Sequence, residues 1–240
     1  MDMTEPKPID WASIPQRASH NWHQIPARAV DAYFMGVDVG QSSDPTAIAI
    51  LQHRIIPLDT WTPNAKAEHW KQDRQTFFDV RHLERLPIGR PYPEYVQNVA
   101  ERLQRPPLNA GCTLAADQTG VGAAVLDLFE EAGLRPNRIT ITAGLEVTQH
   151  GGRGFHVPKS VLITNLEAKS HSGELRIAAD TQDAEALREE LKDFRRLVSS
   201  AGRPSWNARE GKHDDLILAV AIALWISTNR PSFSSSEWVF

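Results

Sequence analysis

The sequence is short of several features, and each shortage narrows the class of protein. It has a single cysteine, Cys112, which cannot form a disulfide within the chain. A reducing compartment such as the cytoplasm is therefore the expected setting. Because Cys112 lies in the apolar stretch GCTLAAD, we expect a small core residue rather than a nucleophile.

Long apolar runs are missing as well. The longest, LILAVAIALWI from Leu216 to Ile226, is far shorter than the roughly 20 residues that a membrane-spanning helix needs. The first residues also lack the basic start, apolar stretch and small-residue cleavage site of a secretory signal. We therefore expect a soluble protein that has no membrane partner and is not exported.

The chain has no excess of positive charge, since its formal net charge is −4. This argues against broad, non-specific binding of polyanions. The stretch from Phe194 to His213 nevertheless holds five Lys or Arg against one Glu, with Trp206 among them. It is either a solvated loop or a groove that follows a phosphate backbone. Its DNA-binding candidates are Arg195, Arg196, Arg203, Arg209 and Lys212.

The 240 residues, 41% of them hydrophobic, are enough for one domain with a sizeable core. Residues 1–32 contain four prolines and no sustained period, which indicates an extended arm or a linker remnant. We expect the folded domain over 33–228 and a flexible tail over 229–240.

The folded part begins with a pattern of strands. Strands are expected at 33–39, 46–52 and 76–84, with a loop or irregular hairpin over the residues between the second and the third. Three strands in succession without a helix favour an antiparallel meander.

Helices and strands then alternate. Helices are expected at 91–104, 121–133, 158–171, 183–193 and 214–227, and strands at 112–117, 138–143 and 174–178. This alternation implies parallel pairing with right-handed crossovers. The predicted fold class is α/β, with a mixed central sheet of an antiparallel meander plus parallel strands, flanked by helices.

Acidic residues stand at three places where this fold could bring them together. Asp38 interrupts the apolar run YFMGVDVG, Asp117 ends a strand, and Asp214 and Asp215 begin the most apolar helix. Ligands of open α/β sheets gather at the carboxyl ends of strands. A cluster of carboxylates repels itself unless cations lie between them, and oxygen ligands suit Mg²⁺ or Mn²⁺. Two such ions would support phosphodiester hydrolysis, whereas zinc-ligand spacings are missing.

Each acid also has an ordinary structural explanation. Asp38 could shape the turn that follows it, and Asp117 could begin a helix or belong to a phosphate loop. Asp214 and Asp215 could simply cap their helix and complement its dipole.

These residues resemble the nuclease domain of phage terminase large subunits, a family of RNase H-like, metal-dependent endonucleases. The resemblance lies in three blocks in this order: GVDVGQSSDPTAIAIL, LAADQTGVGAAVLDLF and GKHDDLILAVAIALW. It extends over about residues 33–228, nearly the whole folded part. Each block alone has low specificity, whereas the ordered set is more specific.

The resemblance implies a site. Asp38 would be the ligand shared by two Mg²⁺ or Mn²⁺ ions, Asp117 would bind one ion, and Asp214 or Asp215 the other. The auxiliary candidates are Asp44, His213 and Lys159. Asp44 could instead shape its turn, and the other two could be solvated side chains.

The resemblance also implies double-stranded DNA as substrate, cleaved during genome packaging by a phage or prophage in the cytoplasm of a bacterial host. A complete terminase carries an ATPase motor, but no GxxxxGK[ST] phosphate loop is present here. The chain is therefore not expected to be the motor: it is either a nuclease portion whose arm once joined the ATPase, or a nuclease encoded as its own chain. An ATPase motor, a portal or a small terminase subunit would be a partner.

Other classes of protein remain open. The loops DVGQSSD and DQTGVG also suit a nucleotide-binding protein of the actin and sugar-kinase class, although that architecture needs two such domains. A dinucleotide-binding loop is less favoured, because Val125 replaces the third glycine of TGVGAAV. An inactive DNA-binding or assembly module is the third alternative.

Overall fold

The computed structural model describes residues 23–40, 44–64, 69–193, 195–198, 204–207 and 213–229. The strands are β1 (His23–Ile25), β2 (Val30–Asp38), β3 (Thr46–Asn64), β4 (His69–Leu86), β5 (Cys112–Asp117), β6 (Asn137–Thr142), β7 (Thr148–His150), β8 (Gly154–Pro158), β9 (Leu175–Ile177), β10 (Arg195–Val198) and β11 (Pro204–Asn207). The helices are α1 (Tyr92–Leu103), α2 (Gly122–Glu131), α3 (Lys159–His171), α4 (Ala184–Asp193), α5 (Asp215–Thr228) and a 3-10 turn, η2 (Leu108–Ala110).

The chain divides into two compact units. One, which we call the main unit, comprises Ala32–His53 and Phe77–Phe240. The other, the ribbon unit, comprises Met1–Asp31 and Arg54–Thr76. Every residue proposed from the sequence as part of the site belongs to the main unit.

The sheet of the main unit has the order β4-β3-β2-β5-β6-β8-β7, with β9 beside β4. The connections after β2 and β3 are too short for a crossover, so these neighbouring strands form the predicted antiparallel meander. From β2 onward, β5, β6 and β8 pair in parallel, and β7 returns antiparallel to β8. The predicted mixed α/β sheet is confirmed.

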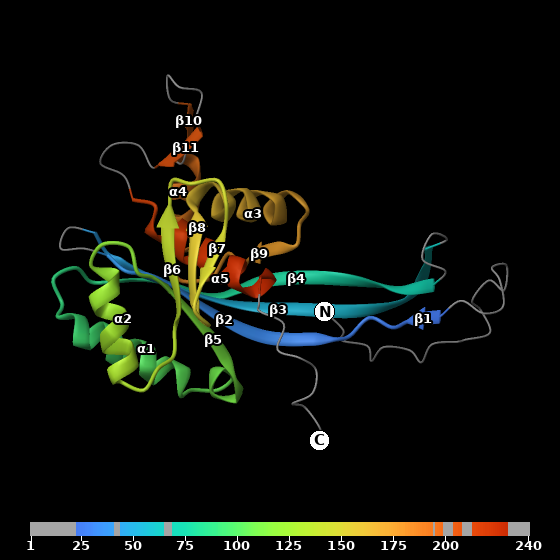
Figure 1. Ribbon diagram of the computed structural model, residues 1–240, viewed down its shortest axis with the longest axis horizontal. Coiled ribbons are helices and arrows are strands. Elements are labelled where there is room, and N and C mark those ends of the chain that lie inside the picture. The colour runs from blue at the N-terminus through green and yellow to red at the C-terminus, as the bar shows by residue number, and fades with distance from the viewer. Residues whose placement is uncertain are drawn as a thin grey trace. The chain divides into compact units, whose positions relative to one another are not determined.

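Side chains of β2 alternate between two cores, one on each face of the sheet. Met35 and Val37 pack with residues of α1 and α2, including Val96 and Phe129. Phe34 faces the opposite core, which α3, α4 and α5 provide. Figure 1 shows α1 and α2 together on one side of these strands and α3, α4 and α5 on the other.

Helix α5 is buried on all sides, which explains why its sequence is apolar throughout. Its backbone lies directly against β2: a Cβ on Gly36 would stand 2.1 Å from the carbonyl oxygen of Ala219 and 2.7 Å from the amide nitrogen of Ala223. Only glycine allows so close an approach. Among the helices in the described part of the chain, none has the length and apolar character needed to span a bilayer.

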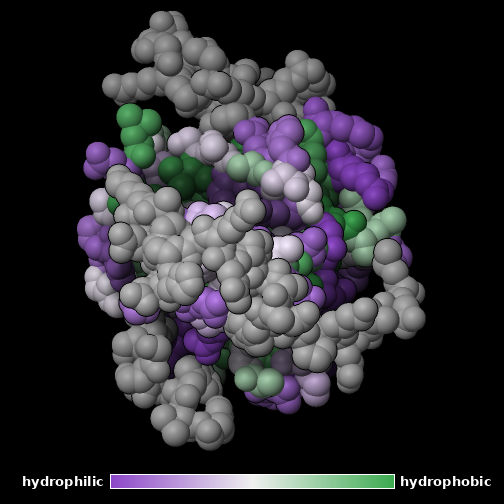
Figure 2. All heavy atoms as spheres, turned by 90° about the vertical axis from the view of Figure 1, so that its right-hand side faces the viewer, coloured by the Kyte–Doolittle hydropathy of each residue, from purple (hydrophilic) through white to green (hydrophobic). Residues whose placement is uncertain are grey.

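The described surface carries few large apolar side chains. On the face drawn in Figure 2, hydrophilic residues predominate among those described, and hydrophobic residues form small separate groups. The exposed large hydrophobic residues are Ile25, Ile56, Ile88, Leu145, Val147 and Leu191. Scattered apolar residues of this kind are normal on a protein surface.

The sequence prediction was incomplete in the ribbon unit and at two hairpins. Of the loop or irregular hairpin expected over 53–75, the loop is wrong, because β3 continues to Asn64 and β4 begins at His69, and these two strands are neighbours in the sheet. In the ribbon unit, β1 pairs in parallel with β4, with His23 opposite His69. The β-branched and aromatic residues of RIIPLDTWT suit such strands. The strands of the β7–β8 and β10–β11 hairpins were not predicted.

Candidate active site

Asp38 and Asp117 lie side by side at the carboxyl ends of two parallel strands. Val37 of β2 is opposite Ala116 of β5, so the next residue of each strand is an aspartate. Adjacent strands are about 4.8 Å apart, and side chains at paired positions share a face. Phe34 and Ala115 belong to the core that α5 covers, so both aspartates are on the α5 face.

Helix α5 adds two more acids to this edge. Ala219 lies against Gly36, two residues before Asp38 in β2, and Asp215 begins the helix one turn before Ala219. One helical turn and two strand residues both span about 6 Å. The negative charges of Asp117, Asp214 and Asp215 all act on Asp38. The structure therefore brings the four predicted acids together.

The electrostatics of this cluster are unfavourable for charged carboxylates. Burial raises the pKa of Asp38 well above its ordinary value, and the charges of Asp117, Asp214 and Asp215 raise it further. Lys159 acts in the opposite direction. Burial also raises the pKa of Asp117, although a hydrogen bond from Thr119 opposes the shift. Among the described residues, the cluster has more negative charge than its surroundings offset.

Asp117 is held in place by the loop that follows β5. The amide nitrogen and the hydroxyl of Thr119 donate to Asp117 Oδ1 at 2.8 and 2.6 Å. The hydroxyl oxygen of Thr119 accepts from the amide nitrogen of Ile141 at 3.1 Å. A Cβ on Gly122 would stand 2.3 Å from the carbonyl oxygen of Asp117, so this glycine lets α2 begin close to the strand. Asp117 thus has a fixed orientation.

Asp214 and Asp215 have different partners. Asp214 occupies the N-cap position of α5 but, within the described residues, makes no side-chain cap hydrogen bond. Its Oδ2 accepts from Lys159 Nζ at 2.7 Å instead. Asp215 is only 5% exposed, and its Oδ2 accepts from Arg85 Nε at 2.7 Å. A capping role therefore does not explain the side chain of Asp214.

A buried ion pair, missed by the sequence reasoning, supports Asp215. Arg85 of β4 contacts both Asp215 and Glu190 of α4. Glu190 accepts from the amide nitrogens of Leu216 and Ile217 at 3.4 and 3.0 Å, at the free amino end of α5. Burial raises the pKa of Glu190 to about 7, despite these donors and Arg85. No local pattern distinguishes Arg85 in RHLERL from its neighbours.

The auxiliary candidates are near the cluster to different degrees. Lys159 begins α3 directly after β8 and reaches Asp214. His213 Nδ1 lies 3.5 Å from Asp215 Oδ1 and 4.0 Å from Asp44 Oδ1. The side chain of Asp44 is 62% exposed.

The predicted DNA-binding residues lie largely outside the description. The backbone of Arg195 and Arg196 belongs to β10, and their side chains lie outside what the structure describes. Arg203, Arg209 and Lys212 lie outside the described residues altogether.

The donor atoms at this edge are carboxylate oxygens, which are the ligands of hard divalent cations. Within the described ranges, no group of three His, Cys, Asp or Glu side chains is already arranged to hold a metal ion. Lys159 holds one of the four carboxylates in an ion pair.

Comparison with known proteins gives matches by structure. No protein-family model and no curated protein matches the sequence. The large terminase nuclease from thermophilic phage G20c with bound magnesium matches with a TM-score of 0.56 and 20% identity, over 84% of each chain. The same nuclease with bound cobalt has a TM-score of 0.56 and 19% identity, over 85% of this chain and 92% of the other.

A nuclease domain from a second phage matches at a similar level. The large terminase nuclease domain of Thermus phage P74-26 has a TM-score of 0.53 and 18% identity, over 89% of this chain and 95% of the other. The chain therefore has the RNase H-like fold of large terminase nuclease domains, as its resemblance to them implies.

Proposed function

We propose that this protein is a metal-dependent endonuclease that hydrolyses DNA phosphodiester bonds, as the nuclease of a phage or prophage terminase. The observation that carries the proposal is the meeting of Asp38, Asp117, Asp214 and Asp215 at one edge of a terminase-nuclease fold. The acids come from parts of the chain that are far apart, and their convergence costs electrostatic free energy. Such a cost is typical of functional sites.

The donor set suits two Mg²⁺ or Mn²⁺ ions. Asp38 would be shared between them, Asp117 would bind one, and Asp214 or Asp215 the other. The raised pKa of Asp38 fits this assignment, because an adjacent cation would offset the repulsion that raises it. A related fold binds magnesium and cobalt in the G20c nuclease. When bound, two such ions activate a water molecule and stabilise the leaving oxygen of a phosphodiester.

The protein's own residues prepare the cluster for this task. Thr119 fixes Asp117, and Arg85 fixes Asp215 through a hydrogen bond. Because Asp215 is committed to Arg85, we assign the ligand role at the start of α5 to Asp214, which is more exposed. Lys159 would then exchange its contact with Asp214 for a phosphate oxygen of the substrate, and so offset negative charge at the scissile group.

The substrate we propose is double-stranded DNA, held in part by the basic stretch 194–213. Because these 240 residues contain no phosphate loop, we assign translocation to an ATPase motor that lies outside them, and a portal or a small terminase subunit would complete the assembly. The alternatives, a nucleotide-binding protein of the actin and sugar-kinase class or an inactive DNA-binding module, predict no cleavage.

The test is cleavage of supercoiled plasmid in Mn²⁺ by the protein and by its Asp38→Asn variant. We expect the variant to lose cleavage by about 1,000-fold or more, since it removes the ligand common to both ions. Asp180→Asn, at an exposed position, is the matched control and should cut normally. Circular dichroism should show that both variants are folded. Undiminished cutting by Asp38→Asn would refute the ligand assignment, and a wild type that never cuts would favour the inactive module.

A further inference from the structure

A second polar site lies in the main unit, on the opposite face of the sheet from Asp38. It is a cavity of about 420 Å³ beside β2, β3 and β4, roofed by the connection between α1 and β5. Its lining residues are Tyr33, Ile50, Gln52, Arg81, His82, Arg102, Arg105, Pro106, Pro107 and Leu108. Pockets that bind small ligands usually have volumes of about 300 to 1,000 Å³. We call this cavity the arginine pocket.

The arginine pocket is well separated from the carboxylate cluster. Tyr33 lies near the amino end of β2 and Asp38 at its carboxyl end, five residues along the same strand. At about 3.3 Å per residue, these two positions are roughly 16 Å apart. Tyr33 also packs against the core of α1 and α2, whereas Asp38 is on the α5 face. The two sites therefore do not share a ligand.

An irregularity in β4 places two polar residues in the pocket. Val80 and Leu83 both belong to the core on the α5 face, although strict alternation would put them on opposite faces. The intervening Arg81 and His82 consequently both line the pocket. Breaks of this kind are concentrated near functional sites because they redirect side chains.

Arg102 and Arg81, at the two polar ends of the pocket, differ in the number of hydrogen bonds and ion pairs that they form. Arg102 donates to Asn98 at 2.7 Å, lies 2.9 Å from His82 and pairs with Glu84. In the part of the chain that is described, Arg81 makes one hydrogen bond, from Nε to Gln52 Oε1 at 2.7 Å. This bond orients the guanidinium group, and the terminal Nη2 also forms a long ion pair with Asp79 Oδ2 at 4.0 Å. At that distance no hydrogen bond is formed, so the terminal nitrogens can still donate to a ligand.

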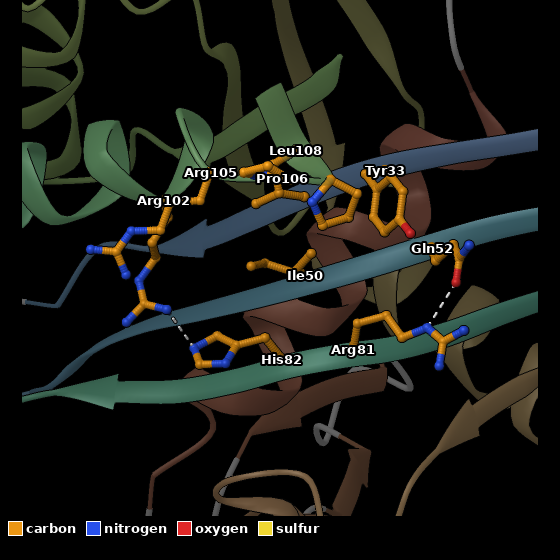
Figure 3. Close-up of a pocket in the computed structure, with 10 residues that line it drawn as sticks. Tyr33, Ile50, Gln52, Arg81, His82, Arg102, Arg105, Pro106 and Leu108 are labelled. Carbon is orange, nitrogen blue, oxygen red and sulfur yellow. Dashed lines mark hydrogen bonds between the residues drawn. The ribbon is translucent and has the colours of Figure 1, made fainter. Parts of the chain in front are cut away.

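The lining combines three arginines with an apolar surface. Each arginine has an acidic partner outside the lining: Glu84 pairs with Arg102, and Asp79 and Glu101 form looser pairs with Arg81 and Arg105 at 4.0 and 3.9 Å. Figure 3 shows Ile50 between the Arg102–His82 pair and the Arg81–Gln52 pair, with Tyr33, Pro106 and Leu108 above it. A guanidinium group binds phosphate through paired donors, and flat apolar walls accept an aromatic ring.

We propose that the arginine pocket binds a nucleotide, with a phosphate on the terminal nitrogens of Arg81 and the base between Ile50 and the Pro106–Leu108 wall. A free nucleotide and one nucleotide of a single strand both have a phosphate and a base that could bind in this way. The proposal goes beyond nuclease activity and does not depend on it.

The experiment is isothermal titration of the full chain with ATP, AMP, a short oligothymidylate and pyrophosphate, in EDTA. We expect saturable binding of at least one nucleotide ligand, and a rise in Kd of about tenfold or more for Arg81→Glu. Arg90→Glu is the matched control, because Arg90 is similarly exposed and lies outside the pocket. Asp38→Asn should bind as the wild type does, which separates this site from the carboxylate cluster.

The ligands distinguish the sources and the competing explanations. Tighter binding of ATP or AMP than of the oligothymidylate assigns a free nucleotide, and the reverse order assigns a single strand. Pyrophosphate binding as tight as ATP binding would overturn the proposal, because the base would then contribute nothing. It would also be overturned by no saturable binding, by equal losses in Arg81→Glu and Arg90→Glu, or by binding of a polyglutamate peptide in place of nucleotides.

Discussion

The two ends of β2 differ in how well the charged side chains around them are balanced by opposite charges. At the carboxyl end, Asp38, Asp117, Asp214 and Asp215 crowd together, and the positive charge of Lys159 opposes their effect on Asp38 in part. Near the amino end, each arginine of the pocket has an acidic neighbour: Glu84 for Arg102, Glu101 for Arg105, and Asp79, beside the hydrogen-bonded Gln52, for Arg81. Among the described residues, the carboxylate cluster keeps an excess of negative charge, whereas the positive charges of the arginine pocket are nearly balanced by acids.

The difference indicates what each site can bind. Crowded carboxylates gain most from a compact divalent cation, because it offsets repulsion among all of them at once. A pocket whose guanidinium groups are mostly engaged gains less from an anion and needs apolar contacts as well to hold a ligand. We therefore expect the carboxylate cluster to be governed by charge, and the arginine pocket by shape together with charge.

The largest effect on stability should come from replacing Arg85, which forms ion pairs with Asp215 of the cluster and with Glu190. Arg85→Met leaves Asp215 and Glu190 buried without their common partner. We expect a loss of about 3 kcal/mol in the free energy of unfolding, somewhat reduced because the Arg85 side chain is 27% exposed. Urea unfolding in EDTA at pH 8 measures it.

The matched control for that variant is Arg188→Met. Arg188 forms an exposed i,i+3 pair with Glu185, so its loss should cost only about 0.3 kcal/mol. If Arg85→Met unfolds at the same urea concentration as Arg188→Met, the ion pair does not support the cluster.

The effect of pH on the free energy of unfolding should be smaller than that of Arg85→Met, and its direction follows from Glu190. Glu190 has a raised pKa of about 7 in the folded protein, against an ordinary value of 4.5. Between these values the folded state binds a proton that the unfolded state has lost, so the contribution of Glu190 to stability is fully present below pH 4.5 and is lost as pH rises through 7. Glu190→Gln should remove about 2 kcal/mol of this fall, after allowance for solvent screening.

Thermal unfolding in EDTA from pH 5 to pH 8 would test this expectation. The matched control is Glu189→Gln, because Glu189 is exposed and pairs with Lys192 at the surface. It should leave the pH profile of the wild type unchanged. Parallel profiles for the wild type and Glu190→Gln would mean that Glu190 stays charged throughout this range.

The carboxylate cluster was predictable from sequence, whereas the arginine pocket was not. Asp38, Asp117 and Asp214 stand at strand ends and a helix start, which short apolar runs and their interruptions reveal. Parallel pairing then implies that they meet, and so the cluster followed from local patterns. The helices and the mixed sheet of the main unit were predictable for the same reason.

The remaining features depend on tertiary packing. Arg85 and Glu190 come from β4 and α4, and nothing in either segment shows that they meet at the start of α5. Arg81 lines a pocket because alternation fails between Val80 and Leu83, and a regular strand pattern conceals such a break. In the ribbon unit, the mixed composition of 53–75 hid two long strands.

The smallest effect we expect is on DNA affinity, and it would sharpen the contrast between the basic groups. Arg195 and Arg196 belong to the basic stretch, and each contact with a phosphate contributes about 0.9 to the slope of log affinity against log salt. If both contact DNA, Arg195→Glu combined with Arg196→Glu should flatten that slope by about 2 and weaken binding to a duplex by about tenfold, or about 1.4 kcal/mol. Anisotropy titrations with a labelled duplex at several salt concentrations measure both quantities.

Arg81→Glu should leave the slope for duplex DNA unchanged, because the arginine pocket binds a single nucleotide rather than the backbone of a double helix. A slope that changes with Arg81→Glu but not with the double variant would exchange the roles of the two basic regions, and would place the duplex on the α1 face.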